Sequence, residues 1–152
     1  TITVLLLSFA AAQDNSADEE AVKKIFPATQ TIKVEARISE GQQFKVYRVF
    51  VKGKIIGWAV KLDVMGKIKP ITFLVVIDVQ GKVTGVIVME YRDIFGSEIK
   101  RSSFLRQFQN KSLKDRIAIG ADIDAVTSAT ISSNAATSAV RKALNIVAEF
   151  IK

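Results

Sequence analysis

The sequence predicts an α+β domain in which an antiparallel meander of strands packs against a long C-terminal helix, with a short helix on the N-terminal side. Between Thr31 and Arg92, β-branched and aromatic residues alternate with polar ones, and short glycine-containing turns interrupt the alternation. After Thr130, apolar residues recur at three- and four-residue spacing, as on one face of a helix. A chain of 152 residues is long enough for one such domain with a substantial core.

The first segment, residues 1–12, is uncharged and ends in three alanines, which is typical of the cleavage site of a secretory signal. It is too short to span a bilayer, which takes about 20 apolar residues. We therefore expect export with cleavage after Ala12, leaving one domain over residues 13–152. A buried N-terminal strand or helix, or the end of a membrane anchor, is the alternative.

The first helix is expected after Ser16, because Ser16 and Glu19 have the spacing of a capping box. The helix should continue through residues 20–26 and stop at Pro27. Three of its residues are expected to face inward: Val22, Ile25 and Phe26.

Four strands are expected next, joined by short turns at residues 51–54 and 78–82, which favours an antiparallel meander. The apolar run at residues 73–77 predicts a central strand covered on both faces. The expected strands are Phe44–Val51, Ile55–Val64, Ile71–Val79 and Val83–Tyr91.

After the strands, residues 93–99 should form a loop and residues 111–124 a connector. Between them, Ser102–Asn110 should form a short helix with Phe104, Leu105 and Phe108 on one face. The last helix is expected over Thr130–Lys152. Its inward residues should be Ala136, Val140, Ala143, Leu144, Val147 and Ile151.

The composition excludes several kinds of chemistry. The chain has neither Cys nor His, which excludes a thiol nucleophile, an iron–sulfur cluster, a Ser-His-Asp triad and an imidazole metal ligand. A bound cofactor is then the natural source of any reactivity. The net charge of +7 favours anionic partners, such as a membrane surface or an acidic redox protein. Nucleic acid is not expected, because basic and aromatic residues form no common stripe.

Residues 124–133 place five hydroxyl side chains directly before the last helix. One hydroxyl is enough to cap a helix, so the simplest interpretation, capping alone, leaves a surplus. The free N–H groups and the positive dipole end of a helix are suited to a phosphate. A ligand that carries a phosphate is therefore a second interpretation of this segment.

The segment Asp124–Thr130, Asp-Ala-Val-Thr-Ser-Ala-Thr, resembles the flavinylation motif Asp-x-x-Ser/Thr-Gly-Ala-Thr of the FMN-binding domain family. That family includes FMN-carrying subunits of sodium-pumping NADH:quinone oxidoreductases and Rnf-type complexes, and small exported relatives. In it, a flavin transferase takes FMN from FAD with magnesium and esterifies the FMN phosphate to the last Thr. The resemblance implies covalent FMN on Thr130. It also implies a cofactor-binding segment made of Asp124, Thr127, Ser128, Ala129 and Ile131.

The resemblance covers nearly all of residues 18–150 in family order, including a helix ending in Phe-Pro and the hairpin at residues 71–86. Residues 90–99 are similar to the loop that exported members place beside the flavin ring. From this loop the resemblance implies Tyr91, Gly96 and Glu98 as cofactor contacts. A half-buried strand tyrosine and a solvated loop acid are the alternatives for Tyr91 and Glu98. Trp58 is expected in the core.

One residue departs from the family motif, since Ser128 stands where the family has Gly. Gly at this position would relieve a strained backbone or allow close approach to the phosphate. We expect Ser to replace it only with a negative φ. Asp124 is expected to begin an Asx-turn, to serve in recognition, or both.

These observations predict an extracytoplasmic electron carrier with covalent FMN, without catalytic residues or a metal site of its own. The expected partners are a flavin transferase, redox donor and acceptor proteins or a membrane electron-transfer complex, and a membrane surface as a peripheral contact. Two alternatives remain: a secreted binding or adaptor module without cofactor, and a flavin reductase of a small acceptor.

Overall fold

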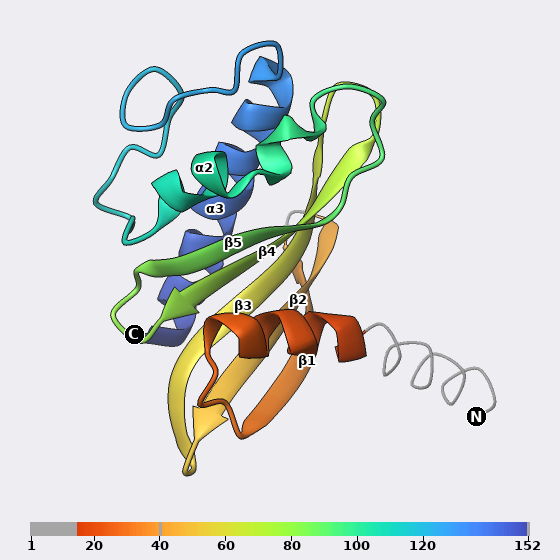
Figure 1. The fold of residues 1–152 in the computed structure, drawn as a ribbon. Helices are drawn as coiled ribbons and strands as arrows, with labels where there is room; N and C mark the ends of the chain where they lie inside the picture. Colours follow the sequence, from red (N-terminus) through yellow and green to blue (C-terminus); the bar gives the residue numbers. More distant parts are fainter. Residues whose placement is uncertain (1–14, 40, 152) are drawn as a thin grey trace, which may run out of the picture.

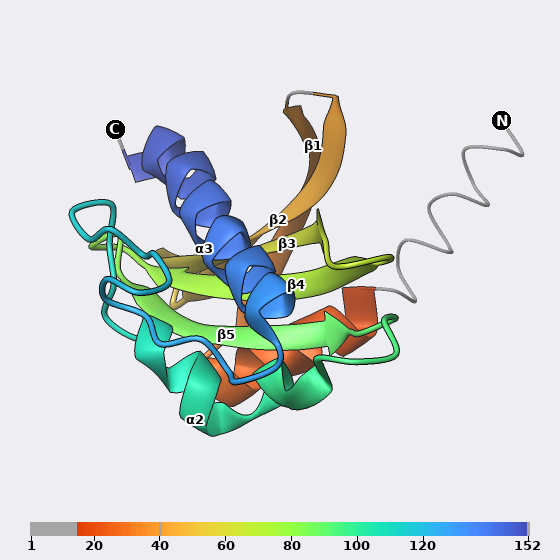
Figure 2. The same cartoon turned by 90° about the horizontal axis from the view of Figure 1, so that it is seen from above.

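The computed structural model describes residues 15–39 and 41–151, and its architecture is α+β, as predicted. A five-stranded antiparallel sheet lies between the long helix α3 (Thr130–Ile151) on one face and an N-terminal helix (residues 15–25) on the other (Figure 1, Figure 2). Within the described part of the chain, no helix is long and apolar enough to cross a membrane. The expected signal segment lies outside the described residues.

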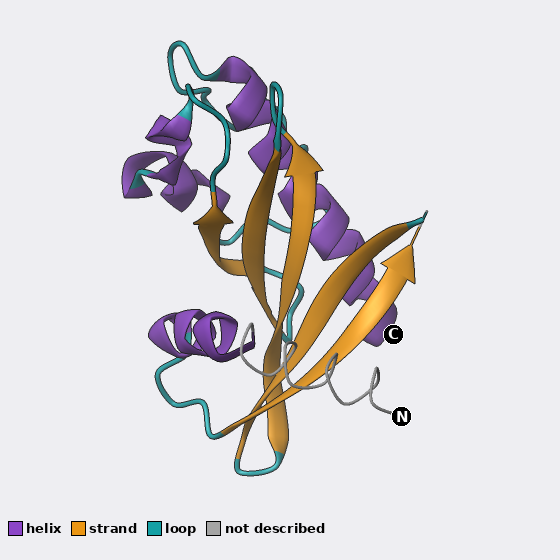
Figure 3. Cartoon of the chain, turned by 90° about the vertical axis from the view of Figure 1, so that its right-hand side faces the viewer, coloured by secondary structure: helices purple, strands orange, loops and turns teal. Residues whose placement is uncertain are grey.

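The sheet is a simple meander in which each strand pairs with the next one along the chain (Figure 3). The prediction of four strands is wrong by one, because a first strand pairs along its whole length with the second. That strand lies at the sheet edge, and its Val34 is 39% exposed, so the sequence shows no strong apolar run there. The strands are β1 (Thr31–Ser39), β2 (Gln42–Val51), β3 (Lys54–Met65), β4 (Pro70–Asp78) and β5 (Val83–Glu90).

Strand β4 is buried from Ile71 to Ile77, which confirms the prediction of a strand covered on both faces. Phe73 and Val75 belong to the larger core, against α3. Leu74 and Val76 belong to a smaller core, against the N-terminal helix. Trp58 is 5% exposed and stacks on Phe150 of α3, so it is a core residue, as expected. The alternation of side chains along a strand therefore builds one core on each face of the sheet.

The N-terminal helix ends before Pro27, as expected, and its Val22, Ile25 and Phe26 face the smaller core. The predicted capping box is wrong, because Ser16 already lies within the helix. Asp18 is buried and accepts hydrogen bonds from the hydroxyl of Tyr47 and from Lys61, whose Nζ lies 3.1 Å away. Lys61 is therefore part of a largely buried polar contact under this helix.

The segment after β5 is less regular than predicted. Instead of a loop followed by one helix, three short pieces follow each other. They bury Ile99, Phe104 and Phe108 against the sheet. Phe104 and Phe108 therefore face inward as predicted, whereas Leu105 is only half-buried. In α3 the predicted inward residues are buried except Ile151, which is 43% exposed. The three pieces are η1 (Ser97–Lys100), α2 (Ser102–Leu105) and η2 (Arg106–Phe108).

Candidate functional site

The candidate site is built around the start of α3, whose first residue is Thr130. The chain enters the helix through a turn in which the N–H of Ala129 donates to the carbonyl of Val126 at 3.0 Å. The third residue of this turn, Ser128, has φ +66°, as type II turns require of that position. The expectation of a negative φ for Ser128 is therefore wrong, because the third residue of a type II turn takes a positive φ. The same geometry explains in physical terms why glycine suits this position.

The hydroxyls before and within the first turn of α3 divide into two groups. Those of Ser132 and Ser133 are buried, whereas Thr127, Ser128 and Thr130 are exposed. Ser133 is structural: its Oγ accepts from the N–H of Val126 at 3.1 Å and donates to a carbonyl of the turn at 2.8 Å. The exposed group includes the expected attachment residue.

The first turn of α3 has free hydrogen-bond donors. Within the described chain, the backbone N–H groups of Thr130, Ile131 and Ser132 have no acceptor, and the first helical bond is donated by Ser133. No hydroxyl of the segment caps these three donors, so capping alone does not account for the cluster. Three free N–H groups at the positive end of a 22-residue helix form a place that accepts an anion.

Asp124 is held by its backbone. Its N–H donates to Oε1 of Gln107 at 2.8 Å, and Nε2 of Gln107 donates back to its carbonyl at 3.0 Å. The carboxylate is exposed and accepts no hydrogen bond from the described residues, so the expected Asx-turn does not form. Sequence reasoning missed Gln107, because nothing in the local pattern shows that η2 meets a residue 17 positions later.

The connector that leads to Asp124 is ordered by Asp122. Its carboxylate accepts from the N–H groups of Ala118 at 2.9 Å and Ile117 at 3.0 Å, and Nζ of Lys111 lies 3.4 Å away. These contacts, led by the hydrogen bond from Ala118, lower the pKa of Asp122 to about 2, against an opposing effect of burial. They hold Ile117 buried at φ +50°, a conformation that β-branched residues rarely adopt.

The loop after β5 lies against the first turn of α3. The hydroxyl of Tyr91 donates to the carbonyl of Phe95, and it lies 2.9 Å from Oγ of Ser132. Gly96 has φ +98°, and a Cβ there would lie 2.5 Å from the Tyr91 hydroxyl oxygen and 2.6 Å from Oγ of Ser132. Only glycine fits this contact. The structure thus brings Tyr91 and Gly96 to the helix turn that begins with Thr130.

A second anchor ties the same loop to the turn between β3 and β4. The carboxylate of Asp93 accepts hydrogen bonds from the backbone N–H groups of three consecutive residues, at 2.8 to 3.3 Å. Sequence reasoning did not identify Asp93, because its partners lie about 25 positions earlier in the chain. The three donors are Lys67, Ile68 and Lys69.

Apolar side chains near this contact face solvent. Ile94 is 82% exposed and Phe95 is 80% exposed, on a loop held at both ends, and Ile131 of α3 is 51% exposed. Glu98 is half-buried in η1, two residues beyond Gly96, and its carboxylate has no partner among the described residues. The site therefore combines an exposed hydroxyl, free N–H donors and uncovered apolar surface.

The candidate site lies within a stretch of the chain that matches a known protein family. A family model described as an FMN-binding domain matches residues 66–145, slightly more than half of the chain. The match includes the loop after β5, the motif at residues 124–130 and most of α3, whereas the N-terminal helix and β1–β3 precede it. No curated protein matches the chain.

Proposed function

We propose a function that starts from one premise: the chain belongs to the FMN-binding domain family. The family supports FMN as the cofactor of a flavin-binding electron carrier. In our proposal the FMN is attached covalently, through its phosphate, to the hydroxyl of Thr130. The observation that carries the proposal is the position of this hydroxyl: it is exposed on the first residue of α3, beside three free backbone N–H groups.

The residues around Thr130 fit the phosphate of FMN. A phosphoester on this side chain keeps negative charge at the helix terminus, where the dipole and the N–H groups of Ile131 and Ser132 stabilise it. The Ser128 hydroxyl already has a partner, because it donates to the carbonyl of Thr127 at 2.5 Å. We therefore assign the attachment to Thr130 alone. Ala129 is buried and offers no side-chain donor, so its part is to shape the turn.

The same surface fits a flat aromatic ring. Ile94, Phe95 and Ile131 expose apolar side chains that a ring tethered at Thr130 would cover. When bound, FMN supplies reversible electron transfer, for which this chain has no side chain of its own. The positive charges of Lys67 and Lys69, whose backbone is tied to the loop through Asp93, favour a cofactor that gains electrons.

Attachment requires a flavin transferase with magnesium and FAD. The hydroxyl oxygen of Thr130 forms the bond to the FMN phosphorus, the pyrophosphate bond of FAD breaks, AMP leaves, and the hydroxyl proton is released. Asp124, whose carboxylate is exposed while its backbone is held by Gln107, is positioned as a recognition residue for that transferase.

The proposed location is outside the cytoplasm, after removal of residues 1–12. There, dilution would remove a dissociable flavin, whereas a covalent bond retains it. The partners are then electron donor and acceptor proteins or a membrane electron-transfer complex. The chain acts as a carrier rather than as an enzyme with a substrate of its own.

The test is co-expression with a flavin transferase, followed by denaturation and intact-mass analysis. We expect a yellow protein that stays yellow when unfolded and carries the mass of one FMN less water. Thr130→Val should remove both signals completely. Ser103→Ala is the control, because it removes an exposed hydroxyl outside the motif and should leave the FMN in place.

Three outcomes would contradict the proposal. A mass addition that persists in Thr130→Val would place the flavin elsewhere. Colour that is lost on denaturation of the unmodified protein would show bound but not covalent FMN. A colourless protein in a host with an active transferase would favour the binding module without cofactor.

A further inference from the structure

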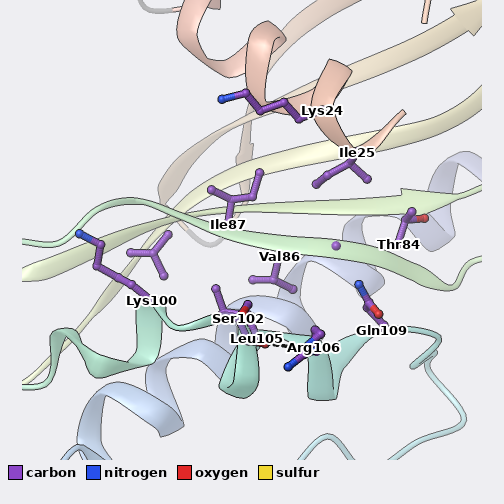
Figure 4. A pocket seen from close by; sticks show the side chains of 12 residues that line it. Lys24, Ile25, Thr84, Val86, Ile87, Lys100, Ser102, Leu105, Arg106 and Gln109 are labelled. Atoms are coloured by element: carbon purple, nitrogen blue, oxygen red, sulfur yellow. Dashed lines mark hydrogen bonds between the residues drawn. The ribbon is translucent and has the colours of Figure 1, made fainter. Parts of the chain in front are cut away.

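A groove of about 540 Å³ runs along β5, away from Thr130. Figure 4 shows its walls: the N-terminal helix, with Lys24 and Ile25, lies on one side of the strand, and α2 and η2, with Leu105 and Arg106, lie on the other. The floor is the strand itself, of which five consecutive residues, 84–88, line the groove. None of the residues assigned to the flavin lines it.

The outer edge of β5 is open along this groove. Among the described residues, β5 is the last strand of the sheet and has a strand partner on one side only. At its start, Val83 exchanges backbone hydrogen bonds with Asn110 and Lys111. Beyond Val83, the described residues outside the sheet make no further backbone bond to the strand. Its sequence, Val-Thr-Gly-Val-Ile-Val-Met-Glu, contains neither Lys nor Pro, the residues that usually protect an edge.

The apolar residues of the groove alternate between its two sides. Ile87 points towards Ile25 of the N-terminal helix, and Val86 points towards Leu105 of α2 (Figure 4). Gly85 packs closely against Ile25. A Cβ added to Gly85 would lie 2.8 Å from Cδ1 of Ile25. A strand added to this edge would project its side chains alternately to the same two sides.

The charges of the groove have one sign. Lys24, Lys100 and Arg106 line it, and no acidic residue does so in the part of the chain that the structure describes. Lys24 lies 4.0 Å from Glu20 in a mostly exposed pair, which neutralises little of its charge. Arg106 uses its Nε to donate to the carbonyl of Ser102 at 3.2 Å, and no other hydrogen bond is made by its guanidinium within the described chain.

We propose that this groove binds an extended acidic segment of a partner protein, which adds as a strand to β5. Backbone hydrogen bonds to the open edge provide affinity, and acidic side chains paired with the three cations provide selectivity. The lining residues Thr84–Val88 accommodate about five residues of such a segment. A second copy of this chain fits less well, because twofold pairing of two β5 edges would bring the same cations face to face.

The proposal does not depend on the flavin, since the groove and the Thr130 site share no residue. It does place a docking surface close to the redox site, because Lys100 ends the short helix η1 that follows Gly96. Peptide binding should therefore be the same in the wild type and in Thr130→Val, so the two proposals can fail separately.

The test uses the ¹⁵N-labelled full chain and the peptide acetyl-Val-Glu-Glu-Glu-Val-amide, which as a strand presents Glu side chains to both sides of the groove. We expect the amide signals of β5 to shift on titration and the hydrogen exchange of its outward amides to slow. The double variant Lys100→Glu/Arg106→Glu should weaken binding at least about tenfold. Lys142→Glu, which reverses an exposed charge on α3 outside the groove, should change it less than about twofold. If the double variant fails to fold, Lys24→Glu, a single change on an exposed side chain, replaces it and should also weaken binding.

Four results would overturn the proposal. The first is no binding of the peptide. The second is equal binding of a peptide N-methylated at alternate residues, which would show attraction of charges without strand pairing. The third is equal weakening by Lys142→Glu, which would show a general effect of net charge. The fourth is a concentration-dependent dimer with protected β5 amides in the absence of peptide, which would make a second copy the occupant.

Discussion

Replacing Ser128 with Gly should stabilise this protein, although most substitutions by glycine destabilise. Ser128 has φ +66°, a conformation that costs a residue with a Cβ about 1 to 2 kcal/mol. Gly does not have this cost, but it loses about 0.5–1 kcal/mol more chain entropy on folding. The substitution also removes an exposed hydrogen bond to the carbonyl of Thr127, worth a few tenths of a kcal/mol. The expected net gain in unfolding free energy is about 0.5 kcal/mol.

The assay is urea denaturation at neutral pH, together with thermal unfolding, where the gain corresponds to a rise of roughly 1 to 2 °C. Ser103→Gly is the matched control, because Ser103 is exposed in helix α2 and should lose about 0.5 kcal/mol. The two variants should therefore differ by about 1 kcal/mol, with opposite signs. Equal destabilisation by both would refute the positive φ at position 128. In the same samples, Ser128→Gly should also be flavinylated at least as fast as the wild type.

Two further predictions concern the anchors of the site. Asp122→Asn should lower the unfolding free energy by about 2 kcal/mol at pH 7, since the pKa of this carboxyl falls from 3.8 to about 2 in the folded state. The loss of unfolding free energy in the variant should be complete above about pH 5 and should shrink as the pH falls towards 2. A loss that stays the same between pH 7 and pH 2 would show that the ionised carboxylate is not its cause. Gly96→Ala should cost about 2 kcal/mol or more, because the new Cβ meets Tyr91 and Ser132 at positive φ. Gly120→Ala, also at positive φ but with nothing within 4 Å, should cost only about 1 kcal/mol, and equal losses in thermal melts would count against the contact.

The two proposed surfaces divide the work of an electron carrier between them. In our two proposals, the start of α3 holds the cofactor and the edge of β5 recognises the partner. The segment from Gly96 to Arg106 connects them, because it contacts the first turn of α3 at one end and lines the groove at the other. Charge reversal in the groove should therefore slow electron exchange with an acidic partner without changing the flavin content.

Local patterns in the sequence determined the fold class and most elements. The spacing of the apolar residues predicted helix α3 from Thr130 and the buried strand β4. Such spacing is informative because each buried face of an element needs apolar residues at fixed intervals. The motif at residues 124–130 predicts an attachment threonine by resemblance alone, and this assignment stays a prediction. Edge strand β1 was missed although its residues alternate between apolar and polar, because it lacks the continuous apolar run that marks the buried strand β4.

Tertiary structure decided how the site is held together and where a partner can dock. The bonds between Gln107 and Asp124, and between Tyr91 and Ser132, join segments that are distant in the sequence. The left-handed φ of Ser128 belongs to the turn by which the folded chain enters α3. The three cations of the groove come from separate segments of the chain. Such contacts depend on which surfaces the folded chain brings within a few ångströms, and a local sequence pattern carries no information about that distance.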